Sequence, residues 1–186
     1  NFADTYFRTG LYPAKLPSGI GMEGSGVVEA VGEGVTHVQA GDRVAYTGSP
    51  LGAYSTGRVM PAASLVKLPE QIAFETAAGM MMRGFTAAYL MRRIYAWKKG
   101  DTFLIHAAAG GVGLIVCQWA KILGLHPIGT VSTDEKAALS KEAGADAMVT
   151  PCPLCHLSLD AWQSKLKKQT GKDFAMPILH LSQLVG

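Results

Sequence analysis

The sequence predicts an α/β protein in two parts, a small β-rich part followed by a parallel sheet flanked by helices. Residues 1–70 are rich in glycine and proline and hold short apolar runs separated by turns, which is typical of short strands. After Pro69 the apolar spacing becomes helical, and from residue 102 onward strand-like and helix-like runs alternate. Such alternation favours parallel strands joined by right-handed crossovers. A hydrophobic fraction of 48% with 17% charged residues is globular composition.

The β-rich part consists of short apolar runs that end at glycines or at proline. Gly26 and Gly32 bound the first run, a turn beginning at Ala40 feeds the second, and Pro69 closes the last. The predicted strands cover residues 26–32, 54–61 and 64–68, and a further strand follows the turn within residues 40–46.

The second part shows helix and strand signals in turn. Gly124 and Gly144 stand where helices favour a left-handed residue, and Thr133 or Asp134 can cap a helix start. The predicted helices cover residues 74–82, 84–97, 110–123 and 133–143, and the predicted strands cover residues 102–107, 127–131 and 147–149.

The turn after the strand at 102–107 carries the main chemical motif. Ala108, Gly110 and Gly113 fit the dinucleotide-binding fingerprint, with alanine in its first position. The first residue makes the tight turn, Gly110 lets the backbone approach a pyrophosphate, and Gly113 lets the helix pack close to the strand. Free N–H groups and the helix dipole then favour phosphates. The predicted cofactor-binding segment is Ala108, Ala109, Gly110, Gly111, Val112 and Gly113.

The end of the next strand indicates which dinucleotide binds. An NAD site has an acidic residue there to bind the ribose hydroxyls, whereas this chain has Ser132. Lys136 lies one helical turn further on and can neutralise a 2′-phosphate, which favours NADP. The alternative is that Lys136 is a solvated surface lysine. Asp134 would oppose the phosphate if its side chain pointed inward.

Four separate motifs, in order, resemble one family. They are the segments 1–6, 8–13, 41–44 and 106–113. Together they are similar to the zeta-crystallin-like quinone oxidoreductases, the zinc-free branch of the medium-chain dehydrogenase/reductase superfamily, and most of all to bacterial members. The resemblance implies a GroES-like substrate domain over residues 1–84, a Rossmann domain over residues 85–186, NADPH as cofactor, a quinone as substrate and a homodimer.

The resemblance also implies which residues line the substrate and nicotinamide. These are Asn1, Tyr6, Tyr12 and Thr86. Tyr6 or Tyr12 can donate a hydrogen bond to the oxyanion that develops on the quinone. The alternative for both tyrosines is ordinary packing. No residue stands out as a general acid.

The zinc ligands of the wider superfamily are missing. Zinc enzymes place a cysteine where this chain has Asn1, and a histidine in a motif that reads Gly21-Met22-Glu23 here. No cysteine lies between residues 1 and 116, so the structural zinc lobe is also expected to be absent. A quinone suits such an enzyme because it accepts hydride without a Lewis acid.

Charge and cysteine content limit the other readings. A net charge of +3 with scattered basic residues argues against nucleic acid, and 3 cysteines favour a reducing compartment, so we expect a cytoplasmic protein without a membrane span. Two alternatives stay open. One is a zinc-free enoyl or enone reductase of the same superfamily, and the other is a non-catalytic NADPH-binding protein, crystallin-like or RNA-binding.

The segment after Val149 follows the family less well. Residues 152–156 read Cys-Pro-Leu-Cys-His, the pattern of c-type haem attachment, which we interpret as coincidence. Pro151 stands where the family has a tyrosine that contacts the cofactor. Residues 151–160 and 173–183 fit poorly, as a locally altered reading frame would produce. Family members have about 320 to 330 residues by the resemblance, so we expect a partial sequence that lacks residues at both ends.

Overall fold

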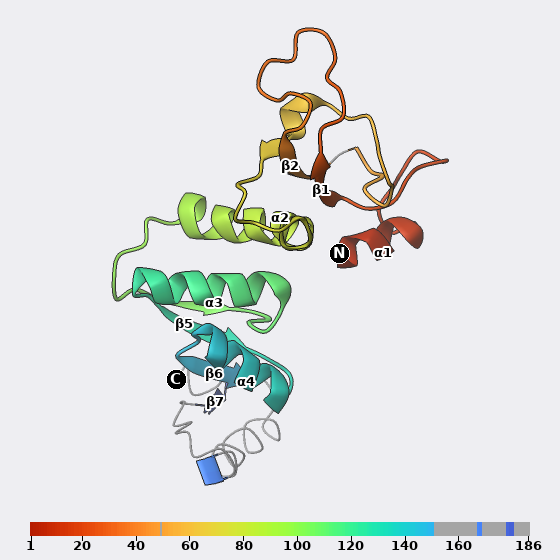
Figure 1. Cartoon of the computed structure of the whole chain (residues 1–186). Coiled ribbons are helices and arrows are strands. Elements are labelled where there is room, and N and C mark those ends of the chain that lie inside the picture. Colours follow the sequence, from red (N-terminus) through yellow and green to blue (C-terminus); the bar gives the residue numbers. More distant parts are fainter. Residues whose placement is uncertain (49, 151–166, 169–177, 181–186) are drawn as a thin grey trace. The chain divides into compact units, whose positions relative to one another are not determined.

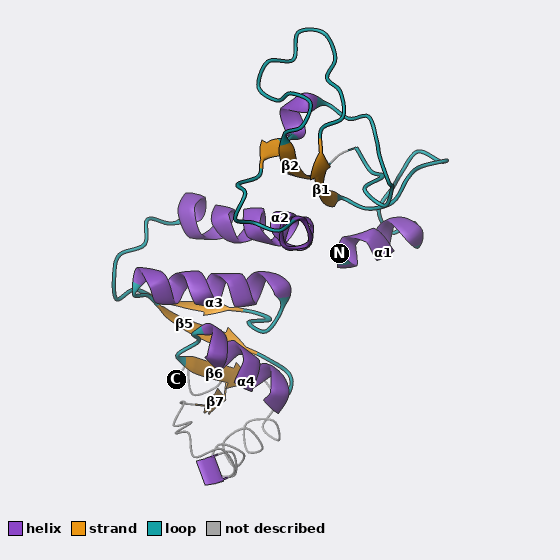
Figure 2. Cartoon of the chain, in the orientation of Figure 1, coloured by secondary structure: helices purple, strands orange, loops and turns teal. Residues whose placement is uncertain are grey.

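The computed structural model describes residues 1–48, 50–150, 167–168 and 178–180. The chain divides into two compact units, Asn1–Phe85 and Thr86–Gly186. Each unit has its own sheet, antiparallel in the first and parallel in the second (Figures 1 and 2). This mixed α/β architecture confirms the predicted fold class.

The first unit is built on a three-stranded antiparallel sheet in the order β1-β2-β3. The strands are β1 (Glu23–Val27), β2 (Arg43–Thr47) and β3 (Val66–Lys67), and a short 3₁₀ helix, η1 (Ala62–Ser64), precedes β3. Ser25 pairs with Ala45 at the centre of the β1–β2 ladder. The core of this unit consists of the buried Val28, Val38 and Val44, packed with Val35, Ala62 and Leu65.

Three predictions for this unit were wrong. Residues 2–8 form a helix, α1 (Phe2–Arg8), that was not predicted. The first strand begins at Glu23 and ends at Val27, earlier than the predicted 26–32. Residues 54–61 form no strand, because backbone groups elsewhere in the unit hold them as a bent loop. The N–H of Tyr54 donates to the carbonyl of Ile20 at 3.0 Å, and the Arg58 guanidinium donates to the carbonyl of Pro50 at 2.8 Å.

A single helix replaces the two predicted at 74–82 and 84–97. α2 (Phe74–Tyr89) passes through Gly84 without interruption and continues into a π-helical turn, η2 (Leu90–Ile94). The helical conformation ends at Tyr95, which is extended with φ −143°. Gly84 is tolerated because the hydrogen bonds and packing of the flanking turns outweigh its low helix propensity.

The second unit contains the predicted alternation of strands and helices. Its parallel sheet has the order β4-β5-β6-β7. The elements are β4 (Thr102–Ile105), α3 (Gly111–Leu123), β5 (His126–Thr130), α4 (Asp134–Ala143), β6 (Ala147–Thr150) and β7 (Ile178–His180). Gly124 and Gly144 end α3 and α4 with φ of 67° and 114°, so both predicted left-handed caps are confirmed.

Helix α3 is packed on two sides by small and branched residues. Cys117 belongs to one buried cluster with Ala108, Val131 and Ala137, and Val116 belongs to another with Ala87 and Met91. The adjacent positions 116 and 117 are fully buried on different sides of the helix. This burial holds α3 rigidly beside β5 (Figure 1), and therefore holds its first turn in place. None of the helices drawn from described residues is long and apolar enough to cross a membrane.

Candidate functional site

The turn between β4 and α3 is tight, and it passes from the exposed Ala107 to the buried Ala108. Ala107 adopts a left-handed conformation with φ 52°, and the N–H of Gly110 donates back to the carbonyl of Ala107 at 2.7 Å. Ala108 is fully buried in the cluster around Cys117. Gly110 then serves as the N-cap of α3 and offers no side chain to the helix N–H groups. The first N–H groups of α3 therefore have no capping side chain, as in helix N-termini that bind anions.

At Gly113 the backbone of α3 comes closest to the backbone of this turn. A Cβ atom built on Gly113 would lie 2.5 Å from the carbonyl oxygens of both Ala107 and Ala108. A Cβ built on Gly110 would lie 3.0 Å from the Ala107 oxygen. The close approach of helix and strand that the sequence predicts at Gly113 is thus present. Ala109, just before Gly110, and Gly111 and Val112, between the two glycines, are partly buried.

Thr130 braces the turn from the neighbouring strand, and sequence reasoning missed it. Its Oγ1 accepts a hydrogen bond from the Ala107 N–H at 3.3 Å and lies 3.1 Å from Nδ1 of His106. Its carbonyl oxygen accepts from the N–H of Ala108 at 3.1 Å. The available signal was its place as the last residue of β5, since parallel strands end at one edge of the sheet.

Ser132 and Lys136 come together as their spacing predicts. The Lys136 ammonium donates to Oγ of Ser132 at 3.1 Å, and both residues are exposed. Thr133 caps α4 by accepting the Lys136 N–H on its Oγ1 at 3.3 Å, which sets where the helix begins. Asp134 is the first residue of that helix and is half-buried. A hydroxyl and a cation therefore stand side by side just beyond the end of β5.

Three of the four predicted substrate residues lie in the first unit. The rings of Tyr6 and Tyr12 pack edge to face with centroids 5.3 Å apart, and the N–H of Tyr12 donates to the carbonyl of Tyr6 at 3.1 Å. Asn1 is the N-cap of α1, the helix that carries Tyr6. The fourth residue, Thr86, is exposed on α2 and is the first residue of the second unit.

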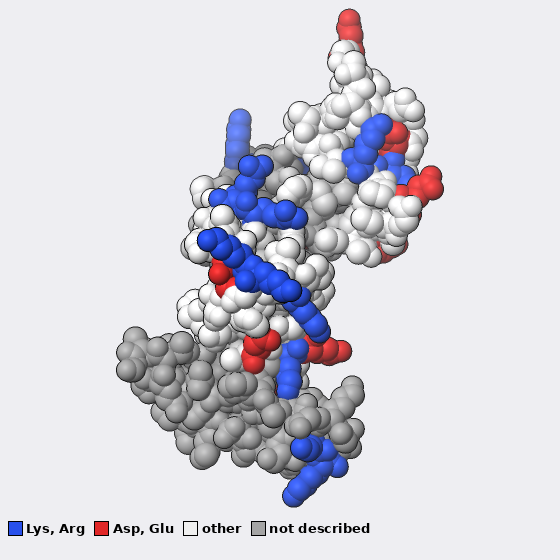
Figure 3. Space-filling view, turned by 90° about the vertical axis from the view of Figure 1, so that its left-hand side faces the viewer, with Lys and Arg blue, Asp and Glu red and all other residues white. Residues whose placement is uncertain are grey.

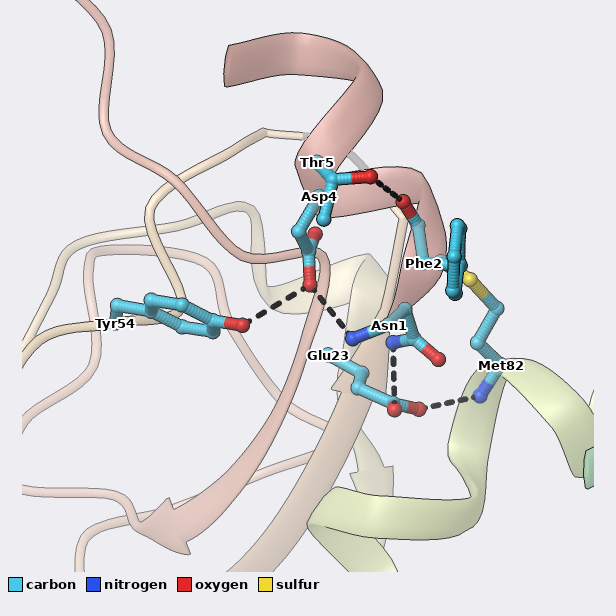
Figure 4. Close-up of polar contacts among 7 residues, drawn as sticks. All are labelled: Asn1, Phe2, Asp4, Thr5, Glu23, Tyr54 and Met82. Carbon is cyan, nitrogen blue, oxygen red and sulfur yellow. Dashed lines mark hydrogen bonds and ion pairs between the residues drawn. The ribbon is translucent and has the colours of Figure 1, made fainter. Parts of the chain in front are cut away.

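A polar network surrounds Asn1 and involves residues that were not predicted (Figure 4). The Asn1 amide nitrogen donates to Oε1 of Glu23 at 2.7 Å, and Oε2 of Glu23 accepts the backbone N–H of Met82 at 2.7 Å. Next to it, the Tyr54 hydroxyl donates to Oδ2 of the buried Asp4 at 3.2 Å. The negative charge of Asp4, and then this hydrogen bond, raise the pKa of Tyr54.

Ligands for a metal do not gather in the part of the chain with described coordinates. Within residues 1–48, 50–150, 167–168 and 178–180, no group of three or more His, Cys, Asp or Glu side chains could hold a metal ion. The Cys-Pro-Leu-Cys-His motif at 152–156 and Pro151 lie outside the described residues.

Basic residues line an open cleft at the other edge of the parallel sheet, where β4, β5 and β6 begin. Lys99, Lys121 and Lys141 stand there. The stem of Lys99 packs on Gly124, which ends α3, and cations near helix C-termini offset the helix dipole. Acidic side chains also stand among the Lys and Arg on the face shown in Figure 3. Over the described residues, this face therefore carries charges of both signs.

Comparisons with known proteins match both units. Residues 1–70 match the family Alcohol dehydrogenase GroES-like domain, and residues 111–180 match the family Zinc-binding dehydrogenase. A GroES-like domain followed by a strand–turn–helix of the dinucleotide-binding type defines the class, the medium-chain dehydrogenases and reductases.

Individual relatives narrow this class. A quinone oxidoreductase of Pseudomonas aeruginosa is 58% identical over 146 residues, which cover 78% of this chain and 45% of that protein. The crystal structure of Escherichia coli quinone oxidoreductase complexed with NADPH superposes with a TM-score of 0.78 at 48% identity, covering 92% of this chain and 51% of that one. A 2-haloacrylate reductase of a Burkholderia species is 46% identical over 150 residues, covering 77% of this chain and 45% of that protein.

Over most of its length the chain is thus a homologue of quinone oxidoreductases, as the resemblance of its motifs predicts. It spans about half the length of the curated relatives that it matches.

Proposed function

We propose that the protein reduces quinones with NADPH by hydride transfer and without a metal ion. The observation that carries the NADPH part is the pairing of Lys136 with Ser132 beyond the end of β5, where an NAD site would have a carboxylate. The quinone part is supported by the relative that is 58% identical and is named a quinone oxidoreductase. The proposed domains are residues 1–84 for substrate and 85–186 for cofactor.

The second unit supplies the binding chemistry for the cofactor. The close contact at Gly113 keeps the start of α3 against the β4 turn, so the first N–H groups of α3 form a compact donor set for the pyrophosphate. Lys136 and Ser132 offer a cation and a hydroxyl donor to the 2′-phosphate. When bound, NADPH supplies the hydride, and the protein contributes positioning.

The first unit supplies the proposed substrate contacts. Tyr6 and Tyr12 hold each other edge to face, which leaves their hydroxyls available to donate to a developing quinone oxyanion. Asn1 adds an amide, and the fourth proposed contact, the hydroxyl of Thr86 on α2, comes from the second unit. The donor set argues against zinc here, because Asn1 and Met22 replace the cysteine and histidine that zinc requires.

We also propose that the protein acts in the cytoplasm as a homodimer. Homology to quinone oxidoreductases supports the dimer, and the low cysteine content supports a reducing compartment. Light scattering coupled to size-exclusion chromatography measures the assembly directly, and a monomeric mass would refute the dimer.

A second candidate function is the reduction of an activated carbon–carbon double bond. The observation that favours it is the 46% identity to a 2-haloacrylate reductase. Steady-state NADPH oxidation by the full-length protein, with matched panels of quinones and enones, separates the two. We expect higher kcat/KM for quinones. Faster turnover of enones would assign the second function, and NADPH binding without oxidation of either panel would assign a non-catalytic role.

The cofactor preference is testable at Lys136. We expect Lys136→Ala to weaken NADPH binding about tenfold or more and to leave NADH binding nearly unchanged, because a hydrogen bond to a charged group contributes about 1.5–3 kcal/mol. Fluorescence titration with both cofactors measures this. Lys15→Ala, at an exposed lysine of the first unit, is the matched control. Equal loss for NADPH and NADH would refute a role for Lys136 in reading the 2′-phosphate.

A further inference from the structure

Glu23 is the central residue of the network around Asn1. It is the first residue of β1, and each of its two carboxylate oxygens accepts a hydrogen bond of 2.7 Å, one from the Asn1 side chain and one from the Met82 backbone. These partners lie 22 and 59 residues away in the sequence. One partly buried carboxylate thus joins the start of α1, the start of β1 and the middle of α2 (Figure 4).

The chemistry of the carboxylate decides which way the Asn1 amide faces. An ionised carboxylate only accepts hydrogen bonds, whereas an amide has a donor end and an acceptor end of nearly equal shape. The Asn1 side chain must therefore turn its NH₂ group toward Glu23, since the opposite orientation would place two acceptor oxygens together. The amide oxygen then points away from Glu23, as Figure 4 shows.

The contact with Met82 fixes the position of the Glu23 carboxylate. An N–H inside a helix ordinarily donates to the carbonyl four residues earlier. The N–H of Met82, inside α2, also has a charged acceptor, the Glu23 carboxylate, at 2.7 Å (Figure 4). Charge-assisted hydrogen bonds of this kind are short and strong, so Glu23 has little freedom to move.

We propose that Glu23 is a positioning residue that sets the orientation of the Asn1 amide, so that the Asn1 oxygen can accept a hydrogen bond from the hydroxyl that forms as the quinone is reduced. The proposal deepens the proposed function and rests on it for the role of Asn1. The Glu23 carboxylate takes the donor end of the Asn1 amide. The acceptor end of the amide is then left for a hydroxyl of the reduced quinone, which is a hydrogen-bond donor. Glu23 acts only through Asn1, and so it should matter for turnover and not for NADPH affinity.

The kinetic experiment uses Glu23→Gln in the full-length protein. A glutamine can accept or donate, so it keeps the size of the side chain and removes the demand on Asn1. We expect kcat for quinone reduction to fall about tenfold while the KM for NADPH stays within about twofold. Glu29→Gln, at an exposed glutamate two residues after β1 ends at Val27, is a matched control that should leave both constants unchanged.

Combining variants at Glu23 and Asn1 distinguishes positioning of the Asn1 amide from a general structural effect of Glu23. If Glu23 acts through Asn1, the double variant with Asn1→Ala should be no slower than Asn1→Ala alone, because the positioned group is already gone. Losses that multiply in the double variant would overturn the proposal.

A readout without turnover keeps the test independent of the proposed function. Asn1 is the only asparagine in the 186-residue sequence, so selective ¹⁵N-asparagine labelling, with assignment by loss of signal in Asn1→Ala, reports its side-chain amide. We expect this resonance to shift in Glu23→Gln, which removes the carboxylate 2.7 Å from the amide nitrogen, and to stay unchanged in Glu29→Gln. An Asn1 resonance that does not change in Glu23→Gln would overturn the proposal. This outcome does not depend on whether the protein reduces quinones. Absence of quinone turnover, together with an Asn1 resonance that shifts in Glu23→Gln, would refute the proposed function and leave the Glu23–Asn1 coupling standing.

Discussion

Replacing Gly113 by alanine tests the close contact between α3 and the β4 turn. The new Cβ would lie 2.5 Å from two carbonyl oxygens, those of Ala107 and Ala108, and ordinary contact begins at 3.4 Å. The helix and the turn must therefore separate locally by about 0.9 Å. Both oxygens belong to the backbone of a turn that is anchored by the fully buried Ala108, so neither can move aside like the end of a flexible side chain.

The expected free-energy change follows from two opposing effects. Overpacking a tight contact costs about 1–3 kcal/mol, and two backbone clashes place Gly113→Ala at the upper end of that range. Alanine also stabilises a helix relative to glycine by about 0.5–1 kcal/mol. We expect a net loss of about 2 kcal/mol in the free energy of unfolding, together with weaker NADPH binding, because the first turn of α3 is displaced.

Gly79→Ala is the matched control for this prediction. Gly79 lies inside α2, and a Cβ built on it meets nothing within 4 Å, so only the gain in helix propensity remains. Urea denaturation followed by circular dichroism measures both variants. The reasoning would be refuted if Gly113→Ala were as stable as the parent protein, or if Gly79→Ala lost as much stability as Gly113→Ala.

Two further predictions concern α4 and α3. Thr133→Ala removes the N-cap contact with the Lys136 N–H and should lower the free energy of unfolding by about 1 kcal/mol, whereas Thr133→Ser should retain it; equal stability of the two variants in urea would contradict the cap. Burial, and then the charge of Asp146, raise the pKa of the Cys117 thiol to about 11. Cys117 should therefore resist iodoacetamide at pH 8 until urea unfolds the chain, which peptide mass mapping checks. Because the folded state favours the neutral thiol, its contribution to stability is complete below the unfolded pKa of about 8.5 and is lost as the pH rises from there toward about 11.

Rules that depend on neighbouring residues alone were sufficient to predict the helix ends of the second unit between residues 102 and 150. The caps at Gly124, Thr133 and Gly144 each depend on a few neighbouring residues, and all three lie where the sequence predicts helix ends. The pairing of Ser132 with Lys136 is likewise a one-turn spacing on a helix, and the structure places their polar atoms 3.1 Å apart.

Local rules failed where distant backbone groups compete. The run at 54–61 has strand-like side chains, but the N–H of Tyr54 bonds to Ile20, and the segment bends instead of pairing. α1 has only seven residues, too few to be stable alone, and it forms in a context where Asp4 is buried against Tyr54.

The sequence alone therefore identified the class of fold and the resemblance to quinone oxidoreductases, and it predicts the residues of a candidate cofactor site, because these depend on motifs whose members lie within a few positions of one another. The tertiary structure alone assigned partners to those residues across long separations. Thr130 braces the β4 turn from the next strand, and Glu23 reaches Met82 across 59 residues. No local pattern encodes such contacts, since they exist only after the strands and helices have packed and brought a donor within 3.3 Å or less of its acceptor.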